Sequence, residues 1–439
     1  MSFMPYDIII GRDDADKKRF GNKGLVKIGK GYVRMGQYTS LSNPIYLDVS
    51  RSHVILVAGK RGSGKSYTLG TIAEELSQLP EEARRNIAPI IFDTMGIFWT
   101  MKYENEKEKY LLEEWELKPK KLPVKIFVPY GYFEEFINKG IPADEPFSLK
   151  VSELNSEDWT IIFNLDIIDP VAVLIERIIG RIKNRENFDI SDIIMEIKTD
   201  ENSNENEKNT AVSLFEGAST WGVFGSKNEK EIKISDFLNP GITSVIDLSV
   251  YNSIGAFNVR ALVIGLICKK LFSERMMSRK QEEVESVRHG IDYMAYQNTR
   301  DVPLVWIFID EAHEFLPKEG KTSATDPLVQ ILREGRQPGI SLVLATQQPG
   351  QIHKDVMTQS DIIISHRLTA QPDILALNDI MQTYLFDSIK KHIDDLPKLK
   401  GSAIILDDNS ERIYPMRVRP RFTWHGGEAP TSIKVEKRI

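Results

Sequence analysis

The chain has 439 residues, of which 41% are hydrophobic and 27% charged, and its formal net charge is −6. This length predicts one large α/β domain with an inserted or appended subdomain. The single cysteine, Cys268, excludes an intramolecular disulfide and a multi-cysteine zinc site, and the negative charge argues against a surface coated with basic residues for nucleic acid, although not against a basic channel inside an assembly. The sequence shows neither a signal peptide nor an apolar run of membrane-spanning length, so we expect a cytoplasmic protein without stable membrane insertion.

The first fifty residues contain short alternating patches, Gly31–Met35 and Asn43–Val49, separated by Gly, Asn and Ser. Period-two alternation between such residues is typical of short strands. We therefore predict a small β element over residues 1–50.

The strongest chemical signal is a phosphate-binding loop that follows the apolar run Val54–Ala58. Its glycines let backbone N–H groups turn toward a triphosphate, Lys65 can reach the β and γ phosphates, and the Ser66 hydroxyl is placed to ligate Mg²⁺. A helical pattern from Tyr67 to Leu79 completes the strand–loop–helix context. The predicted nucleotide-binding residues are Gly59, Lys60, Arg61, Gly62, Ser63, Gly64, Lys65, Ser66 and Tyr67.

Further near-continuous apolar runs predict a mostly parallel sheet that is covered on both faces. They are Pro89–Asp93, Val124–Val128, Thr243–Leu248, Leu304–Ile309, Ser341–Ala345, Ile362–Ser365 and Ala403–Leu406. The fold class is thus α/β, with residues 51–145 and 241–415 as the two parts of the core and 416–439 as a C-terminal tail.

Two stretches interrupt this pattern. Residues 146–240 are mostly helical, including Val171–Lys183 and Ile190–Lys198, and we interpret them as a helical insertion whose polar run Asp200–Asn209 forms a mobile loop. Residues 273–300 mix charges with Met276, Met277, Met294 and Tyr296. They indicate a solvated helix and loop, or alternatively a surface that faces a partner or a pore.

A second chemical centre lies at Asp310 and Glu311, which directly follow the apolar run Leu304–Ile309. Proteins of the α/β class place ligands at the carboxyl ends of their strands. There Asp310 can hold Mg²⁺ and Glu311 can polarise the attacking water. For His313, which could also contact the γ-phosphate region or a polynucleotide, we favour a structural hydrogen bond.

The segment Arg333–Gly339 and the following strand supply the remaining candidates. A guanidinium can neutralise charge on a transferring phosphoryl group, and NTPases often supply it from a neighbouring subunit. We select Arg336 for this role, with Arg333 next; the alternative is a structural ion pair with a nearby acid. Gln347 ends the next strand and can sense the γ-phosphate by orienting water.

The chain resembles the HerA-like ATPases of the HerA/FtsK branch of P-loop proteins. The resemblance rests on an ordered set of segments, His53–Tyr67, Phe92–Gly96, Val245–Ser249, Phe308–His313, Arg333–Pro349 and Arg417–Gly427. It implies a RecA-like P-loop core, ATP and Mg²⁺ as cofactors, and a homo-oligomeric ring, usually a hexamer, that moves double-stranded DNA through its centre. It also implies a NurA-type nuclease as a partner in end resection.

Two features depart from the family pattern. Family members usually begin with a longer β-barrel that docks the nuclease, and about fifty residues precede the phosphate loop here, so nuclease partnership is the weakest of these expectations. The family commonly has an acidic residue after Asp93–Gly96, where this chain has Ile97. Asp93 itself is either a support of the nucleotide site or an ordinary strand-end cap.

Our first hypothesis is a DNA translocase with DNA repair as one possible setting, in which Lys318, Lys321, Ser323 and Thr325 are candidates for contacting DNA. The alternatives are an ATPase that pumps DNA or protein in conjugation or secretion, and a nucleotide switch in a defence or repair complex. Glu311→Gln would leave a switch intact and stop a motor. A small-molecule kinase is disfavoured because Glu311 supplies a water-activating base.

Overall fold

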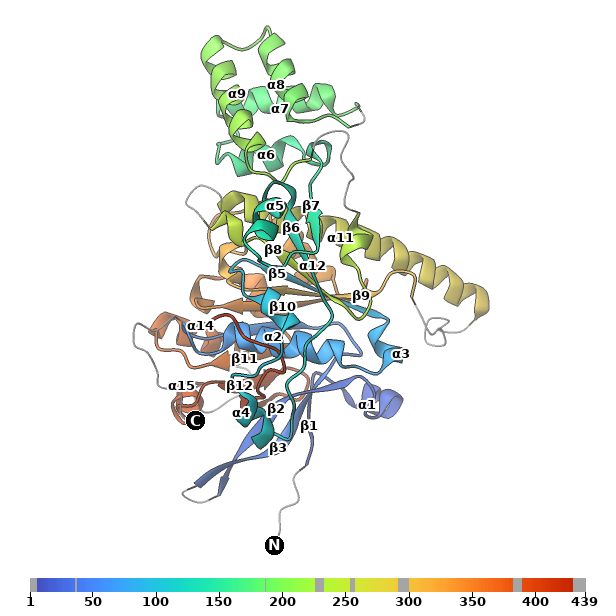
Figure 1. Cartoon of the computed structure of the whole chain (residues 1–439), viewed down its shortest axis with the longest axis vertical. Coiled ribbons are helices and arrows are strands. Elements are labelled where there is room, and N and C mark those ends of the chain that lie inside the picture. The colour runs from blue at the N-terminus through green and yellow to red at the C-terminus, as the bar shows by residue number, and fades with distance from the viewer. Residues whose placement is uncertain are drawn as a thin grey trace.

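One mixed sheet organises the computed structural model, which describes residues 6–35, 38–185, 187–225, 233–252, 257–290, 300–381 and 389–428. Figure 1 shows the sheet running from the N-terminal end of the molecule to a group of helices at the opposite end. Within the described residues it has thirteen strands in the order β1-β3-β2-β13-β12-β11-β4-β10-β9-β5-β8-β6-β7.

The parallel half of this sheet contains seven of the eight predicted apolar strands and adds β7, which was not predicted; the eighth is β12, which is antiparallel. The members of the parallel half are β4 (Val54–Ala58), β5 (Ile87–Asp93), β6 (Val124–Pro129), β7 (Glu145–Phe147), β8 (Thr243–Asp247), β9 (Leu304–Ile309), β10 (Ile340–Thr346) and β11 (Ile362–His366). Strand β10 lies between β4 and β9 and pairs with both in parallel. The carboxyl ends of β4 and β9, which carry the two predicted chemical centres, therefore lie at the same edge of the sheet.

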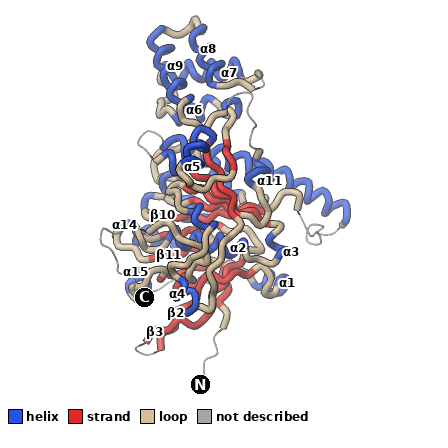
Figure 2. The backbone as a smooth tube through the Cα atoms, in the orientation of Figure 1, coloured by secondary structure: helices blue, strands red, loops and turns tan. Residues whose placement is uncertain are grey.

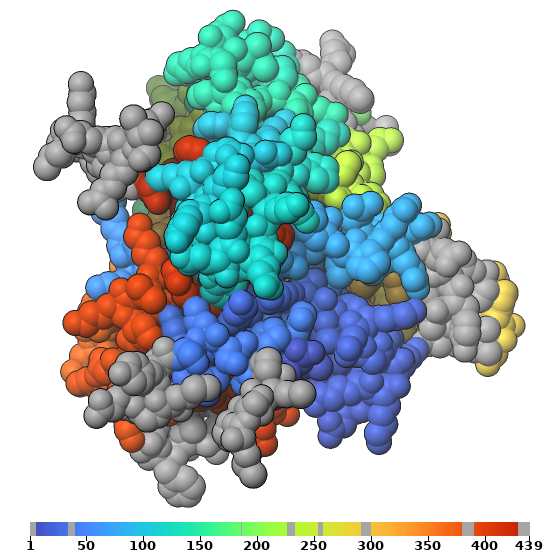
Figure 3. Space-filling model, turned by 60° about the horizontal axis from the view of Figure 1, so that its bottom comes forward, coloured from blue at the N-terminus to red at the C-terminus, as the bar shows by residue number. Residues whose placement is uncertain are grey.

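The other half is antiparallel and includes the N-terminal strands. It contains β12 (Ser402–Asp407), β13 (Arg412–Val418), β2 (Leu25–Met35), β3 (Tyr38–Asp48) and β1 (Ile8–Ile10), of which β1 alone pairs with its neighbour in parallel. The predicted N-terminal strands thus continue the core sheet, because β2 pairs with β13. This continuation was not predicted. Figure 3 shows the N-terminal surface in blue beside the C-terminal surface in orange and red.

Helices cover both faces of the sheet. Ile55 and Val57 of β4 join one hydrophobic core with Leu69, Ile72 and Leu76 of α2 (Lys65–Ser77). Leu56 of β4 belongs to a second core, which includes residues of α11 (Phe257–His289) and α12 (Thr325–Glu334). The other core helices are α1 (Asp14–Phe20), α3 (Glu81–Arg84), α4 (Lys109–Glu114), α5 (Phe133–Asn138), α13 (Lys354–Gln359), α14 (Gln371–Met381) and α15 (Ile389–Asp394). No helix in the described part of the chain has the length and apolar character needed to cross a membrane.

A group of helices projects from one end of the sheet, as Figure 2 shows. It comprises α6 (Ser156–Ile162), α7 (Pro170–Ile182), α8 (Ile190–Thr199) and α9 (Glu205–Ser219), with α10 (Ile234–Phe237) following. These helices lie within the predicted insertion, whose limits we keep as a proposal.

The predicted mobile loop over Asp200–Asn209 is wrong for its second half. Residues from Glu205 onward form the first turns of α9, because the Asn204 side chain accepts from the N–H of Glu207 while Glu207 accepts from the N–H of Asn204. This reciprocal pair is a capping box that stabilises a helix start despite the polar composition. In the stretch 273–300, α11 accounts for the residues up to His289, whereas Met294 and Tyr296 lie outside the described residues.

Candidate nucleotide site at the carboxyl ends of the central strands

The phosphate loop joins the end of β4 to the start of α2. The N–H of Gly59 donates to Thr346 O at 3.2 Å, and the N–H of Lys60 donates to Arg367 O at 3.0 Å. Gly64 has φ 115° directly before the helix, a conformation that side-chain-bearing residues rarely adopt. These contacts fix the loop against β10 and β11 and direct the N-terminus of α2 at its centre, as an anion site requires.

His366, at the end of β11, supports the loop from behind and was not a predicted site residue. Its Nε2 lies 2.8 Å from Thr68 Oγ1, and its Nδ1 lies 3.0 Å from Ser402 O. A Cβ on Gly59 would lie 2.7 Å from the Cβ of His366, so glycine is needed for this close packing. Burial lowers the pKa of His366 to about 4, so the ring is neutral near pH 7. The sequence signal was a histidine ending a buried strand beside the loop strand.

The predicted metal ligands meet across the sheet. Ser66 Oγ donates to Asp310 Oδ2. Burial raises the pKa of Asp310, although Ser66 and Lys65 act in the opposite direction. A hydroxyl beside a carboxylate is an oxygen donor set that suits Mg²⁺, which takes few protein ligands and completes its shell with water and phosphate oxygens.

Glu311 turns toward the same site because its backbone adopts a left-handed conformation, with φ 52°. Such a conformation is uncommon for a residue other than glycine and is concentrated at functional sites. Gln347 Nε2 donates to Glu311 Oε1, whereas Glu311 Oε2 is buried with no hydrogen-bond partner in the described structure. One carboxylate oxygen is therefore held, whereas the other lies 3.7 Å from His313 Nδ1 without a hydrogen bond and can accept one.

The remaining predicted residues of the loop have different environments. Lys65 is buried, and burial lowers the pKa of its ammonium, while Glu311 and Asp310 act to raise it. Lys60, Arg61 and Gly62 are exposed at the mouth of the loop. His313 Nδ1 lies 3.2 Å from Thr346 Oγ1, consistent with the structural hydrogen bond that we favoured.

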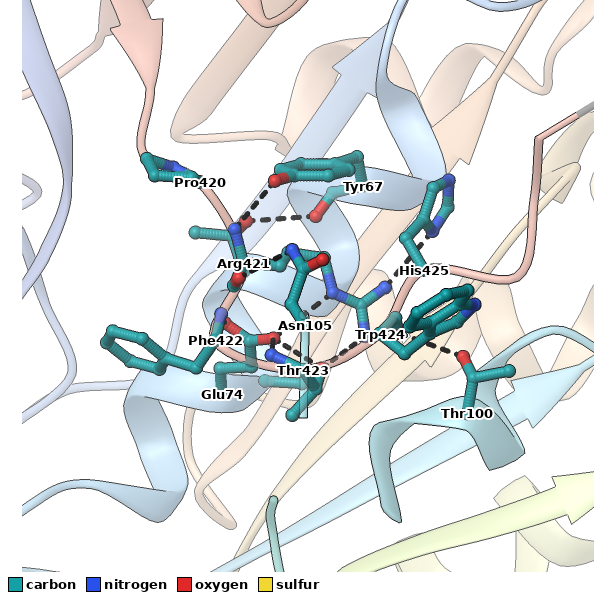
Figure 4. A network of polar contacts seen from close by, with 12 residues as sticks. Tyr67, Glu74, Thr100, Asn105, Pro420, Arg421, Phe422, Thr423, Trp424 and His425 are labelled. Atoms are coloured by element: carbon teal, nitrogen blue, oxygen red, sulfur yellow. Dashed lines mark hydrogen bonds and ion pairs between the residues drawn. The ribbon is translucent and has the colours of Figure 1, made fainter. Parts of the chain in front are cut away.

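Tyr67 directs its side chain away from the loop, into the C-terminal segment. Its hydroxyl donates to Glu108 Oε2 at 2.7 Å and accepts from the N–H of Arg421 at 2.6 Å. Figure 4 shows Tyr67, Arg421 and His425 grouped beside α2. Any contact of Tyr67 with a nucleotide in this arrangement comes from its backbone.

The same segment clamps α2 through Glu74, which is fully buried. Glu74 accepts from Arg419 Nη1 at 2.9 Å, from Arg421 Nε at 3.1 Å and from the backbone of Phe422 and Thr423 at 3.0 Å each. Burial alone would raise the pKa of Glu74, but the two guanidinium groups hold it below its usual value. The helix that carries Lys65 and Ser66 is thus fixed by residues at the far end of the chain.

Asp93 is a strand-end cap beside the site. Its carboxylate accepts the N–H groups of Gly96 at 2.8 Å and Phe98 at 2.7 Å. Burial and the neighbouring Asp247, its partner in the β5–β8 register, raise the pKa of Asp93 to about 7. This geometry agrees with the capping alternative.

The two predicted arginines differ in their interaction partners. Arg333, in the last turn of α12, pairs with Asp355 at 2.6 Å, as the ion-pair alternative proposed. Arg336 lies in the turn after α12, because the helix ends at Glu334. Arg336 is exposed and has no hydrogen bond or ion pair with the described residues.

The residues predicted to contact DNA also have different environments. Lys321 pairs with Asp326 at 3.0 Å, and Thr325 is buried with its hydroxyl donating to Phe315 O. Lys318 is exposed, and its ammonium makes no ion pair or hydrogen bond within the described part of the chain. Its backbone N–H donates to Gln351 O at 2.9 Å.

Comparison with known families decides the relationship. The family model described as "Helicase HerA, central domain" matches residues 33–271, more than half of the chain. The chain belongs to the HerA family. A second family model, for the zonular occludens toxin Zot, matches residues 249–371.

Individual relatives agree with this assignment. A DNA double-strand break repair helicase HerA of Pyrococcus furiosus is 27% identical over 180 residues, which are 38% of this chain and 31% of the relative. A probable HerA helicase of Methanocaldococcus jannaschii is 30% identical over 159 residues, 33% of this chain and 32% of the relative. The chain thus matches about a third of the length of these two proteins.

Solved structures agree on the fold. The HerA-family chain described here aligns with VirB4 of Thermoanaerobacter pseudethanolicus at a TM-score of 0.56 and 10% identity, covering 90% of this chain and 96% of VirB4. It aligns with the bacterial conjugative coupling protein TrwB at a TM-score of 0.50 and 12% identity, covering 92% and 97%. The α/β P-loop ATPase fold predicted from the sequence is confirmed.

Proposed function

We propose that this HerA-family protein is an ATP-driven motor that moves double-stranded DNA and works as a ring-shaped oligomer with its ATP sites at subunit interfaces. The observation that carries the proposal is the position of Arg336 relative to Lys65. Strand β10 has seven residues, which at roughly 3.3 Å per residue separate its ends by about 20 Å. Arg336 precedes β10, whereas the phosphate loop follows the parallel strand β4 at the opposite edge. Arg336 therefore suits the nucleotide of a second copy, not its own.

The site residues fit ATP hydrolysis. The backbone of the loop and Lys65 would hold the phosphates, and Ser66 with Asp310 would hold Mg²⁺, which neutralises phosphate charge when bound. Glu311 Oε2 is the available acceptor for a proton of the attacking water, and Gln347 keeps the carboxylate oriented through Oε1. Arg336 from a second copy would stabilise charge on the transferred phosphoryl group.

A short segment of the chain connects this site to Lys318, a candidate for contacting DNA. Gln347 contacts Glu311, and four residues later Gln351 accepts the N–H of Lys318. A shift of Gln347 between nucleotide states would thus be transmitted to the loop that presents Lys318. An exposed lysine binds duplex phosphates in a salt-dependent and sequence-tolerant way, which suits a translocase. The named activity of the HerA relatives supports DNA as the cargo.

The first test is steady-state ATP hydrolysis with and without linear duplex DNA, over protein concentrations that span assembly. We expect DNA to raise the rate of ATP hydrolysis by the wild-type protein. Arg336→Ala should abolish this hydrolysis while nucleotide still binds. A rate that does not respond to DNA would contradict DNA as cargo and favour a protein pump or a nucleotide switch.

Mixing two inactive variants tests the shared site directly. In a mixed ring, an Arg336→Ala subunit keeps Glu311 and can receive Arg336 from a Glu311→Gln neighbour. The mixture should therefore hydrolyse ATP faster than either variant alone. The control replaces Glu311→Gln by the double variant Glu311→Gln/Arg336→Ala, which offers no arginine and should restore nothing. Equal rates in both mixtures would reject the interface site.

A further inference from the structure

The outer end of α11 forms an arm, which we define as residues 277–289. The inner part of this helix is buried in the core, whereas the arm projects beyond the rest of the molecule, as Figure 1 shows. Its base is fixed by Arg275, whose guanidinium donates to Pro338 O at 2.8 Å and to Val302 O at 2.7 Å. The base of the arm is thus held by the protein body.

An apolar stripe runs along the arm on the side that faces away from the protein body. Met277 is 59% exposed, Val284 49% and Val287 74%. Their spacing of seven and ten residues places them on one helix face, where the exposed Lys280 and Gln281 lie between Met277 and Val284. Ser278 and Glu282, which lie on the opposite face, are buried. An aligned set of exposed apolar side chains of this kind marks an interaction surface more often than scattered single residues do.

The base of the stripe adjoins the surface that carries Arg336. Met276 lines an open pocket of about 420 Å³ together with Arg333, Glu334, Arg336 and Gln337. The stripe therefore begins one residue from a surface with an exposed guanidinium that lacks a counter-charge in the described chain.

We infer that the arm stripe is a docking surface for a second copy of this chain, and that it packs on the edge of that copy where its nucleotide site lies. The inference rests on the proposed function, because Arg336 then has to face the acidic pair and the triphosphate of the second copy. The charge of Arg336 determines which edge of the second copy it faces, and the arm beside it adds an apolar contact. Such a contact joins two different surfaces, so it is heterologous and can close into a ring.

The receiving edge exposes a matching apolar side chain. Met95 is 54% exposed on the turn after β5, next to the strand that carries Asp310 and Glu311. The turn is held in place because Asp93 accepts the N–H groups of Met95 and Gly96. We assign Met95 of the second copy as a contact of the arm stripe.

The test places charge on the stripe in the full-length protein. Val284→Glu/Val287→Glu should raise the concentration for half-assembly, measured by light scattering with Mg–ATP, at least about tenfold, and interface-dependent ATP hydrolysis should fall with it. Both side chains are largely exposed, so the melting temperature of the monomer should not change. The matched control is Ile167→Glu/Ile168→Glu in the helical insertion, where the side chains are 84% and 89% exposed. This control should assemble as wild type does.

The outcomes separate the arm from the proposed function. Arg336→Ala should still assemble and lose hydrolysis, so an assembled, inactive Arg336→Ala beside a dissociated arm variant supports both proposals. An arm variant that assembles as tightly as wild type overturns the arm inference and leaves the shared site standing. A wild type that stays monomeric at every concentration overturns both. Met95→Lys should recover assembly when combined with Val284→Glu, and its failure to do so would overturn Met95 as the contact.

Discussion

The two edges of the central sheet differ in how completely their charged side chains are partnered within the chain. At the carboxyl edge, Ser66 bonds to Asp310 and Gln347 bonds to Glu311. At the opposite edge, Arg336 is exposed with no partner among the described residues. The first edge brings its groups together by folding alone, whereas the second exposes a cation that, under the proposed function, acts on a second copy. If the proposed function holds, folding positions the groups for hydrolysis and assembly supplies Arg336.

The largest expected effect is at the self-contained edge. Glu311→Gln keeps the shape of the side chain and removes its capacity to accept a proton, so kcat should fall about 10²- to 10⁴-fold. Binding of ATP should persist, because the loop and Lys65 are unchanged. Single-turnover hydrolysis and a nucleotide titration measure the two properties. A kcat within tenfold of wild type would show that Glu311 is not the base.

Glu74 tests whether the carboxyl edge depends on the clamp behind α2. Glu74→Gln leaves buried Arg421 without its carboxylate and Arg419 with only Glu75, 2.6 Å from its Nε. Removing one partner from a buried ion network costs about 3–5 kcal/mol of unfolding free energy. Urea unfolding at pH 7 measures this loss, with exposed Glu82→Gln as the control. A loss below about 1 kcal/mol would mean that the clamp is not needed.

The same variant has a defined pH dependence. The folded-state pKa of Glu74 lies below its ordinary value near 4.5, so its contribution to stability is complete above that pH and is lost as the pH falls through the folded value. The difference in stability between wild type and Glu74→Gln should therefore narrow below pH 4.5. A difference that stays constant to low pH would contradict the paired, ionised state.

Asp247 offers a smaller test beside the site. A carboxyl group whose pKa is higher in the folded state than in the unfolded state lowers the stability of the fold as the pH rises between those two values. For Asp93 the two values are 3.8 and about 7. Asp247→Asn removes the neighbouring charge, so it should lower the pKa of Asp93, and each unit of that fall corresponds to about 1.4 kcal/mol. In thermal unfolding, the melting temperature of the variant should rise relative to that of wild type at pH 8 but not at pH 4. Exposed Asp301→Asn should show no such difference.

The smallest effect is expected for Arg333, which sharpens the contrast at the second edge. Its pair with Asp355 is largely exposed on the arginine side, and such pairs contribute about 0–1 kcal/mol. Arg333→Gln should therefore keep ATP hydrolysis within about threefold of wild type, whereas Arg336→Ala should lose it. If Arg333→Gln were the inactive variant instead, the assignment of the two arginines would have to be exchanged.

The sequence predicted the parts of this molecule that depend on local patterns. Buried strands such as β9 and β10 are unbroken apolar runs, and the phosphate loop has a fixed spacing, so both could be placed. Strand β13 was missed because Pro415 and two arginines, Arg412 and Arg417, break its apolar pattern. The start of α9 was missed because its polar residues outweighed a capping signal, Asn204 followed by Glu207, that was present in the sequence.

Long-range pairing explains what else could not be predicted. His366 lies 298 residues from its partner Thr68, and no local pattern connects them. The choice of Asp355 as the partner of Arg333, 22 residues away, likewise depends on how α12 and α13 pack. Asp310, Glu311 and Gln347 were placed together because strand ends in a parallel sheet converge, which is a rule of topology and not of sequence distance.

The Glu74–Arg419 contact spans 345 residues, and this separation bears on how the protein is made. During synthesis α2 emerges first, and the guanidinium groups that neutralise Glu74 emerge 345 and 347 residues after it. Until then the helix that follows the phosphate loop carries an acid that cannot be buried, and β2 lacks its sheet neighbour β13. A growing chain on the ribosome would thus lack the Glu74 contacts behind the phosphate loop until β13 and the residues after it had joined the fold.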